Sequence, residues 1–139
     1  SAESYRGKLY VIGGSGSDGR LIEEYDPDSD EWTTLRNSPS RRYDAASAVI
    51  NGRIYVIGGG EDEPEDRINA YDIEEDEWIT ALTPMPKRLR QCSAVVLNGK
   101  IYVAKIKMAL SQTLSTAMTP VLTAGKPSKN CPLPGPGPP

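Results

Sequence analysis

The sequence predicts an all-β fold that is assembled from repeated small sheets. The hexapeptide Leu-Tyr-Val-Ile-Gly-Gly at residues 9–14 returns as Ile-Tyr-Val-Ile-Gly-Gly at residues 54–59 and begins a third time at residues 101–103. A Tyr-Asp pair and then an Asp-Glu-Trp triplet follow the first two copies at matching distances. A period of about 46 residues that carries several short strands is typical of a propeller blade, which buries its faces against its neighbours.

One complete unit runs from Pro39 to Thr83. The small and apolar residues 45–50 predict its first strand. Asn51-Gly52 predicts a two-residue hairpin turn, because both residues tolerate positive φ. The continuous apolar run at 53–57 predicts a second strand that is buried on both faces, as between adjacent blades.

The second half of this unit follows the glycines that close the hexapeptide. Gly58 and Gly59 end the second strand, because a residue without Cβ permits the close approach of another backbone segment. A polar loop leads to a third strand around residues 68–72, and an acidic turn leads to a fourth strand that opens with Trp78. The unit is therefore a four-stranded sheet.

Two incomplete units flank the complete one. The first repeats the pattern from its second strand onward, with strands expected at 8–12, 21–26 and 32–35. The third starts near Pro84 and gives two strands, after which the pattern stops at Val103. We therefore predict one complete four-stranded blade and two incomplete ones.

Composition separates the repeats from the end of the chain. Every acidic residue and every aromatic residue lies in residues 1–103, whereas residues 104–139 are rich in Lys, Ser, Thr and Pro. This second part is predicted to be an irregular and mostly disordered tail, because residues 126–139 hold too little apolar surface to offset the entropy of ordering. The residues Leu110, Leu114 and Met118 could line one side of a short helix.

Charge and cysteine content exclude several classes of partner and compartment. The net charge of −3 argues against nucleic acid or an anionic membrane as a partner. No run of about 20 apolar residues predicts a membrane span. Cys92 and Cys131 make no disulfide framework, so we expect a cytoplasmic location. The chain starts with Ser1 close to a strand, and we expect it to be a fragment.

The combined motifs resemble the kelch repeat, over roughly residues 5–103 and in units of about 5–37, 38–83 and 84–103. They are Gly-Gly after Tyr-Val-Ile, then Tyr-Asp, then Trp, then Met-Pro with a nearby Arg. The signature residues in this chain are Gly13, Gly14, Tyr25, Trp32, Gly58, Gly59, Tyr71 and Trp78.

The resemblance implies a partial kelch β-propeller. A complete propeller of this family closes with six or seven blades, so the rest of a parent chain would supply the missing ones. The short loops and the residue pattern of the repeats are most similar to those of the BTB–kelch adaptors of cullin-RING ubiquitin ligases.

The alternation of strand direction predicts where a partner binds. The loops at 15–20, 36–44, 61–67 and 83–91 should all emerge at the same end of the sheets, and long loops on a rigid scaffold usually carry recognition. The candidate partner-binding residues there are Arg41, Arg42, Tyr43, Arg88 and Arg90. Arginine forks pair carboxylates in a bidentate manner, so we expect a protein partner with an acidic segment. Alternatively, these arginines pair with local acids or with the backbone of a neighbouring blade.

The remaining motifs of the chain predict neither ligand binding nor catalysis. Trp32 and Trp78 are expected to pack between blades. Residues 14–19 match a nucleotide fingerprint, but a strand follows where that fingerprint needs a helix. Residues 26–37 begin like a calcium loop but lack its glycine and its final glutamate. The sequence holds no histidine. We therefore predict no catalytic residues, no metal site and no cofactor.

The sequence thus favours a protein-interaction module, the substrate-recognition part of a ubiquitin-ligase adaptor, with no enzymatic activity. Two alternatives stay open. One is a fragment of a kelch-type carbohydrate-active enzyme such as a sialic acid epimerase. The other is a truncated product without independent function.

Overall fold

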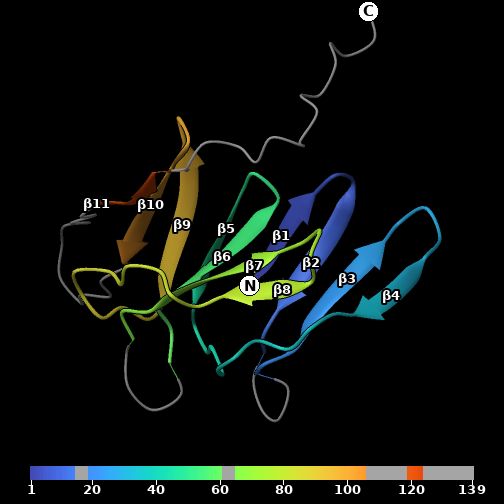
Figure 1. The fold of residues 1–139 in the computed structure, drawn as a ribbon, viewed down its shortest axis with the longest axis horizontal. Coiled ribbons are helices and arrows are strands. Elements are labelled where there is room, and N and C mark those ends of the chain that lie inside the picture. Colours follow the sequence, from blue (N-terminus) through green and yellow to red (C-terminus); the bar gives the residue numbers. More distant parts are fainter. Residues whose placement is uncertain (15–18, 61–64, 106–118, 124–139) are drawn as a thin grey trace, which may run out of the picture.

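The computed structural model describes residues 1–14, 19–60, 65–105 and 119–123 of the chain. These residues form eleven strands in three antiparallel sheets. Figure 1 shows the sheets side by side, with the second sheet between the first and the third. The predicted all-β fold is confirmed. No described segment forms a helix of the length and apolar character that a membrane span needs.

The first sheet contains four strands in chain order: β1 (Ala2–Tyr5), β2 (Lys8–Ile12), β3 (Ile22–Asp26) and β4 (Glu31–Thr34). It has one strand more than we predicted from the sequence. The residues of β1 are mostly polar, and the turn after it is Arg6-Gly7 where the other units have Asn-Gly. Arg6 and Gly7 nevertheless have φ values of 48° and 79°, so they form the tight turn that pairs β1 with β2.

The second sheet is the complete unit that the sequence predicts. Its strands are β5 (Ala46–Ile50), β6 (Arg53–Ile57), β7 (Ile68–Asp72) and β8 (Glu77–Ile79), again in chain order. Asn51 and Gly52 both have positive φ, at 51° and 74°. The predicted hairpin turn between β5 and β6 is therefore confirmed.

The third sheet combines two predicted strands with one from the tail. The strands β9 (Cys92–Leu97) and β10 (Lys100–Lys105) form the expected hairpin, and β11 (Thr119–Thr123) pairs antiparallel with β10. The order β9-β10-β11 places β11 where β3 and β7 lie in the other sheets. The rest of the tail lies outside the described residues, as do the predicted helix near Leu110 and the predicted disorder at 126–139.

Each pair of neighbouring sheets encloses one apolar cluster. We call the side of a sheet that points toward the preceding sheet its leading face, and the side toward the following sheet its trailing face. Tyr10, Ile12 and Ile22 on the trailing face of the first sheet pack with Ile54 and Tyr71 on the leading face of the second.

The second cluster repeats this arrangement one sheet further along. Ala46, Ile57 and Ile68 on the trailing face of the second sheet pack with Ile101 and Val103 on the leading face of the third. The second sheet is therefore buried on both faces, as its continuous apolar strand predicts.

The two tryptophans differ in burial. Trp78 is partly buried against the cluster between the first two sheets, which agrees with the predicted packing role. Trp32 occupies the same position in the first sheet, yet its exposed fraction is 57%. The difference arises because no described sheet packs on the leading face that carries Trp32.

Candidate protein-interaction surface

The loops that the sequence assigns to one end of the sheets do meet there. The linker between the first two sheets touches the β2–β3 loop, where the backbone N–H of Arg42 donates to the carbonyl of Gly19 over 3.2 Å. The linker before the third sheet touches the β6–β7 loop, where Leu89 N–H donates to Glu65 O over 2.9 Å. We call this end, formed by residues 19–20, 36–44, 58–60, 65–67 and 83–91, the loop end.

Glycines allow these backbone segments to cross at short range. A Cβ on Gly58 would lie 2.5 Å from the carbonyl oxygen of Leu89, and a Cβ on Gly59 would lie 2.6 Å from that of Tyr43. Both glycines also have positive φ, at 63° and 80°. The Gly-Gly pair therefore fixes the positions of both linkers relative to the second sheet.

Arg42 is buried beneath this surface. Its side chain is 1% exposed, and Nη1 donates to the carbonyl of Gly58 at 2.8 Å and lies 3.0 Å from Oε2 of Glu65. The Asn69 amide is oriented so that its nitrogen donates to the carbonyl of Ile68. In this orientation Asn69 Oδ1 accepts a hydrogen bond from Arg42 Nη2 at 3.2 Å. Burial lowers the pKa of the Arg42 guanidinium, and the nearby Glu65 carboxylate opposes that shift.

Arg42 therefore corrects one part of the sequence prediction. It cannot contact a partner directly, because its guanidinium is enclosed by the protein. It instead joins the first linker to the β6–β7 loop, which is the alternative role that we left open for the arginines. The sequence could not predict that Arg42 is buried while the neighbouring Arg41 is exposed, because two adjacent arginines in a linker look alike until the fold shows which one points inward.

Glu65 links the buried arginine to the surface. Arg67 Nε lies 2.9 Å from the same Oε2 atom, and Arg67 Nη2 donates to Oε1 at 3.1 Å. The Arg67 side chain is mostly exposed. One carboxylate is thus shared by two guanidinium groups.

The other predicted residues lie at or near the surface. Arg41, Arg88 and Arg90 are exposed, and Tyr43 is partly buried with its ring against Gly19. Leu89, between Arg88 and Arg90, is held by hydrogen bonds through its N–H to Glu65 and through its carbonyl to Gly59. Two guanidinium groups are therefore carried on a fixed stretch of backbone.

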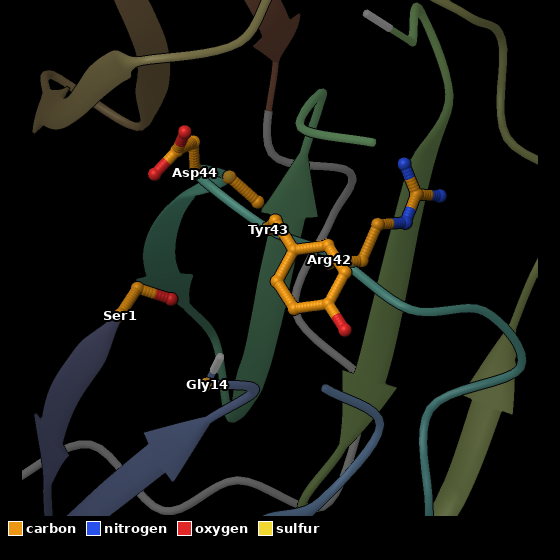
Figure 2. Close-up of a pocket in the computed structure, with 6 residues that line it drawn as sticks. Ser1, Gly14, Arg42, Tyr43 and Asp44 are labelled. Atoms are coloured by element: carbon orange, nitrogen blue, oxygen red, sulfur yellow. The ribbon is translucent and has the colours of Figure 1, made fainter. Parts of the chain in front are cut away.

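A hollow of about 370 Å³ opens beside the first linker. It is lined by Ser1, Gly14, Arg42, Tyr43, Asp44 and Ala45. Figure 2 shows that the Arg42 guanidinium points away from Ser1 and Gly14, so Arg42 lines the hollow with atoms closer to its backbone. The hollow lies where β1 and β5, the first strands of two neighbouring sheets, begin.

Sequence reasoning missed two exposed cations of the loop end. Arg20 Nε donates to the carbonyl of Ser38 at 2.8 Å, and Arg67 pairs with Glu65 as described above. Both lie at the edges of loops that were predicted for this end, so their loop position was the available signal. Within the described ranges, no group of three or more His, Cys, Asp or Glu side chains is placed to hold a metal ion.

Comparison with known proteins places the repeats in a family. The Kelch motif matches residues 1–39 and 41–85. Kelch-like protein 23 of Homo sapiens is 35% identical over 100 residues, covering 68% of this chain and 17% of that protein. Kelch-like protein 35 of Mus musculus is 37% identical over 102 residues, covering 70% and 18%. An F-box/kelch-repeat protein of Arabidopsis thaliana is 35% identical over 105 residues, covering 70% and 28%.

A solved structure agrees with these sequence matches. The structure of YjhT has a TM-score of 0.67 and 27% sequence identity, and the match covers 74% of this chain and 32% of that one. The chain thus spans less than a third of the length of these similar proteins.

Proposed function

Since the chain belongs to the kelch-motif family, we propose that it acts as part of a protein-interaction module, without catalysis, and that its loop end binds an acidic segment of a partner protein. Long connections on a stack of rigid sheets are where recognition usually resides. The linkers and the β6–β7 loop of this chain form such a surface, and hydrogen bonds between the loops hold it in place.

The observation that carries the proposal is the pair Arg88 and Arg90. Both side chains are exposed, and the backbone between them is fixed at Leu89 from both sides. Less conformational entropy is lost when a partner binds to groups whose backbone is already ordered. Guanidinium groups favour carboxylates, because their fork of N–H donors matches two carboxylate oxygens.

The finer role that we propose is substrate recognition within a cullin-RING ubiquitin ligase adaptor of the cytoplasm. The similarity to two Kelch-like proteins over about 70% of this chain supports it. In that role the loop end would hold the protein that is to be modified, and other parts of a longer chain would connect it to the ligase.

Reversal of charge at the loop end tests the proposed binding. We expect the double variant R88E/R90E to bind a short fluorescent peptide rich in Glu and Asp about tenfold more weakly, because each attraction is replaced by a repulsion. The measurement is fluorescence anisotropy with the full chain. Binding by the unmodified chain should also weaken between about 0.05 M and 0.5 M salt, since exposed ion pairs are screened.

Lys100→Glu is the matched control, because Lys100 is exposed at the start of β10, beside the hairpin turn and far from the linkers. It should leave peptide binding unchanged. An equal loss in Lys100→Glu, or no loss in R88E/R90E, would contradict the proposal. Thermal melting of each variant separates loss of binding from loss of fold.

A further inference from the structure

The backbone that carries Arg88 and Arg90 is held by one residue of the β6–β7 loop, Glu65. Leu89 and Glu65 form an isolated antiparallel bridge, in which Leu89 N–H donates to the carbonyl of Glu65 at 2.9 Å. The Glu65 N–H donates to the carbonyl of Gly59 at 2.7 Å, and the Gly59 N–H donates to the carbonyl of Leu89 at 2.8 Å. These three hydrogen bonds form a closed set, so a shift of Glu65 would move the backbone between the two arginines.

The Glu65 side chain is in turn held by the buried Arg42. Nη1 of Arg42 lies 3.0 Å from Oε2 of Glu65, and the side chain of Arg42 is 1% exposed. Arg67 also pairs with this carboxylate, but its side chain is 62% exposed, and exposed ion pairs contribute little. A buried charge that loses its partner is costly, so Arg42 fixes Glu65 more firmly than Arg67 does.

The repeat itself does not require an arginine at this position. Leu89 is the equivalent of Arg42 in the next unit, because each lies nine residues before the Asn-Gly turn of the hairpin that follows. Their backbone N–H groups also make equivalent hydrogen bonds, from Arg42 to Gly19 and from Leu89 to Glu65. Leu89 packs against the apolar cluster between the second and third sheets, whereas Arg42 reaches across to the β6–β7 loop. An apolar side chain therefore serves at this position in the third unit.

We propose that Arg42 is a positioning residue for the acidic partner segment: through Glu65 it holds Arg88 and Arg90 in the arrangement that binds, although it does not touch the partner. This inference rests on the proposed function of the loop end. Loss of the buried pair would free the second linker, and more conformational entropy would then be lost on binding. Stability alone does not account for the pair, since a buried ion pair is often no more stabilising than apolar residues of similar volume.

Three variants of the full chain separate this positioning role from simple charge attraction. Arg42→Leu introduces the residue found in the third unit and removes a positive charge, Glu65→Ala removes a negative charge, and the double variant R42L/E65A leaves the net charge unchanged. Charge attraction alone predicts weaker, tighter and unchanged binding of an acidic peptide, respectively. We expect all three variants to bind the Glu- and Asp-rich peptide about fivefold more weakly in fluorescence anisotropy, because each frees the second linker. The double variant should bind no more weakly than the single ones, since the two side chains act as a unit.

Asp66→Ala is the matched control, because it removes an equal charge from the neighbouring residue and leaves Arg42 and Glu65 in place. It should bind the peptide at least as tightly as the unmodified chain. Arg42→Lys keeps a charged donor near Glu65 and should retain more of the binding than Arg42→Leu. The melting temperature of R42L/E65A should lie close to that of the unmodified chain, since replacement of a buried ion pair by apolar groups is often neutral.

Hydrogen exchange gives a second measurement, which does not need the peptide. In Arg42→Leu, Glu65→Ala and the double variant, the backbone amides of residues 83–91 should exchange about tenfold faster than in the unmodified chain, because the hydrogen bond from Leu89 to Glu65 opens more often. The amides of β6 should keep their exchange rates. A purely structural role of Arg42 would instead raise exchange in the sheets as well and lower the melting temperature.

The outcomes separate this inference from the proposed function. Unchanged binding in Arg42→Leu and Glu65→Ala, alongside weaker binding in R88E/R90E, would overturn the inference and leave the proposed function standing. Tighter binding by Glu65→Ala would overturn it in favour of charge attraction, and a collapse of the melting temperature in R42L/E65A would make Arg42 a structural residue. If the unmodified chain does not bind the peptide or R88E/R90E binds it normally, the proposed function fails. Exchange at residues 83–91 then decides alone: faster exchange supports the positioning of this linker by Arg42, and unchanged exchange overturns it.

Discussion

Gly58 and Gly14 lie in two copies of the same motif, but a side chain would clash only at Gly58. Gly14 ends the first hexapeptide, and a Cβ added there would meet nothing within 4 Å. Gly58 has φ of 63°, and a Cβ there would meet the backbone of the following linker. The residue type is the same in both places, but a crossing backbone segment makes one of them necessary.

We expect Gly58→Ala to lower the free energy of unfolding by more than about 2 kcal/mol, since positive φ alone costs an alanine about 1–2 kcal/mol. The contact with Leu89 O adds to that cost. Gly14→Ala is the control and should change stability by less than about 0.5 kcal/mol. Urea denaturation followed by circular dichroism measures both. Equal effects of the two substitutions would show that the linker does not cross the second sheet as described.

Several residue roles could be predicted from sequence, and others could not. The turn at Asn51-Gly52 follows from local conformational preference, which acts over two residues. The burial of Arg42 follows from contacts with Gly58, Glu65 and Asn69, which lie 16 to 27 positions further along the chain. Sequence spacing placed Arg42 in the right loop but carried no information on which side of that loop faces inward.

At the scale of the element, Tyr71, Asp76 and Trp78 join the second sheet to the linker that follows the first sheet. Asp76 accepts hydrogen bonds from the Tyr71 hydroxyl and from the Arg36 N–H, and these bonds lower the pKa of its carboxyl group. Trp78 adds both apolar packing and a hydrogen bond to the same linker. These hydrogen bonds add to the apolar cluster that lies between the first two sheets.

Substitution of Trp78 tests this contribution. We expect Trp78→Ala to destabilise the chain by about 3 kcal/mol, because it removes a large aromatic ring that packs between sheets together with its hydrogen bond. Trp32→Ala is the control at the equivalent position. It should cost less than about 1 kcal/mol, since Trp32 is mostly exposed. An unchanged melting temperature in Trp78→Ala would contradict the packing role.

Two strands mark the limit of prediction at this scale. The sequence missed β1 because its residues do not alternate clearly between apolar and polar, although Arg6-Gly7 adopts the hairpin geometry. It also missed β11, because residues 119–123 lie where the repeat pattern has ended. Both strands pair with a neighbour along the backbone, which depends little on side-chain identity, although Pro120 in β11 has no N–H to donate.

At the scale of the whole molecule, the sequence predicted the architecture well. The hexapeptide repeats located the sheets because equivalent apolar residues are buried wherever another sheet packs on them, with Ile54 and Val56 in the second sheet matching Ile101 and Val103 in the third. In a stack of this kind, the stability of each unit comes largely from its neighbours. The middle sheet has a neighbour on both faces, whereas the outer sheets have one each among the described residues.

Hydrogen exchange measured by mass spectrometry tests this central claim directly. The backbone amides of β6 and β7 should exchange most slowly, because local opening of the middle sheet disrupts two apolar clusters at once. Those of β4 should exchange fastest among the strands of the two four-stranded sheets, since β4 is an exposed edge strand. Uniform protection across the three sheets, or slowest exchange in the first sheet, would contradict a stack that is held together by its middle member.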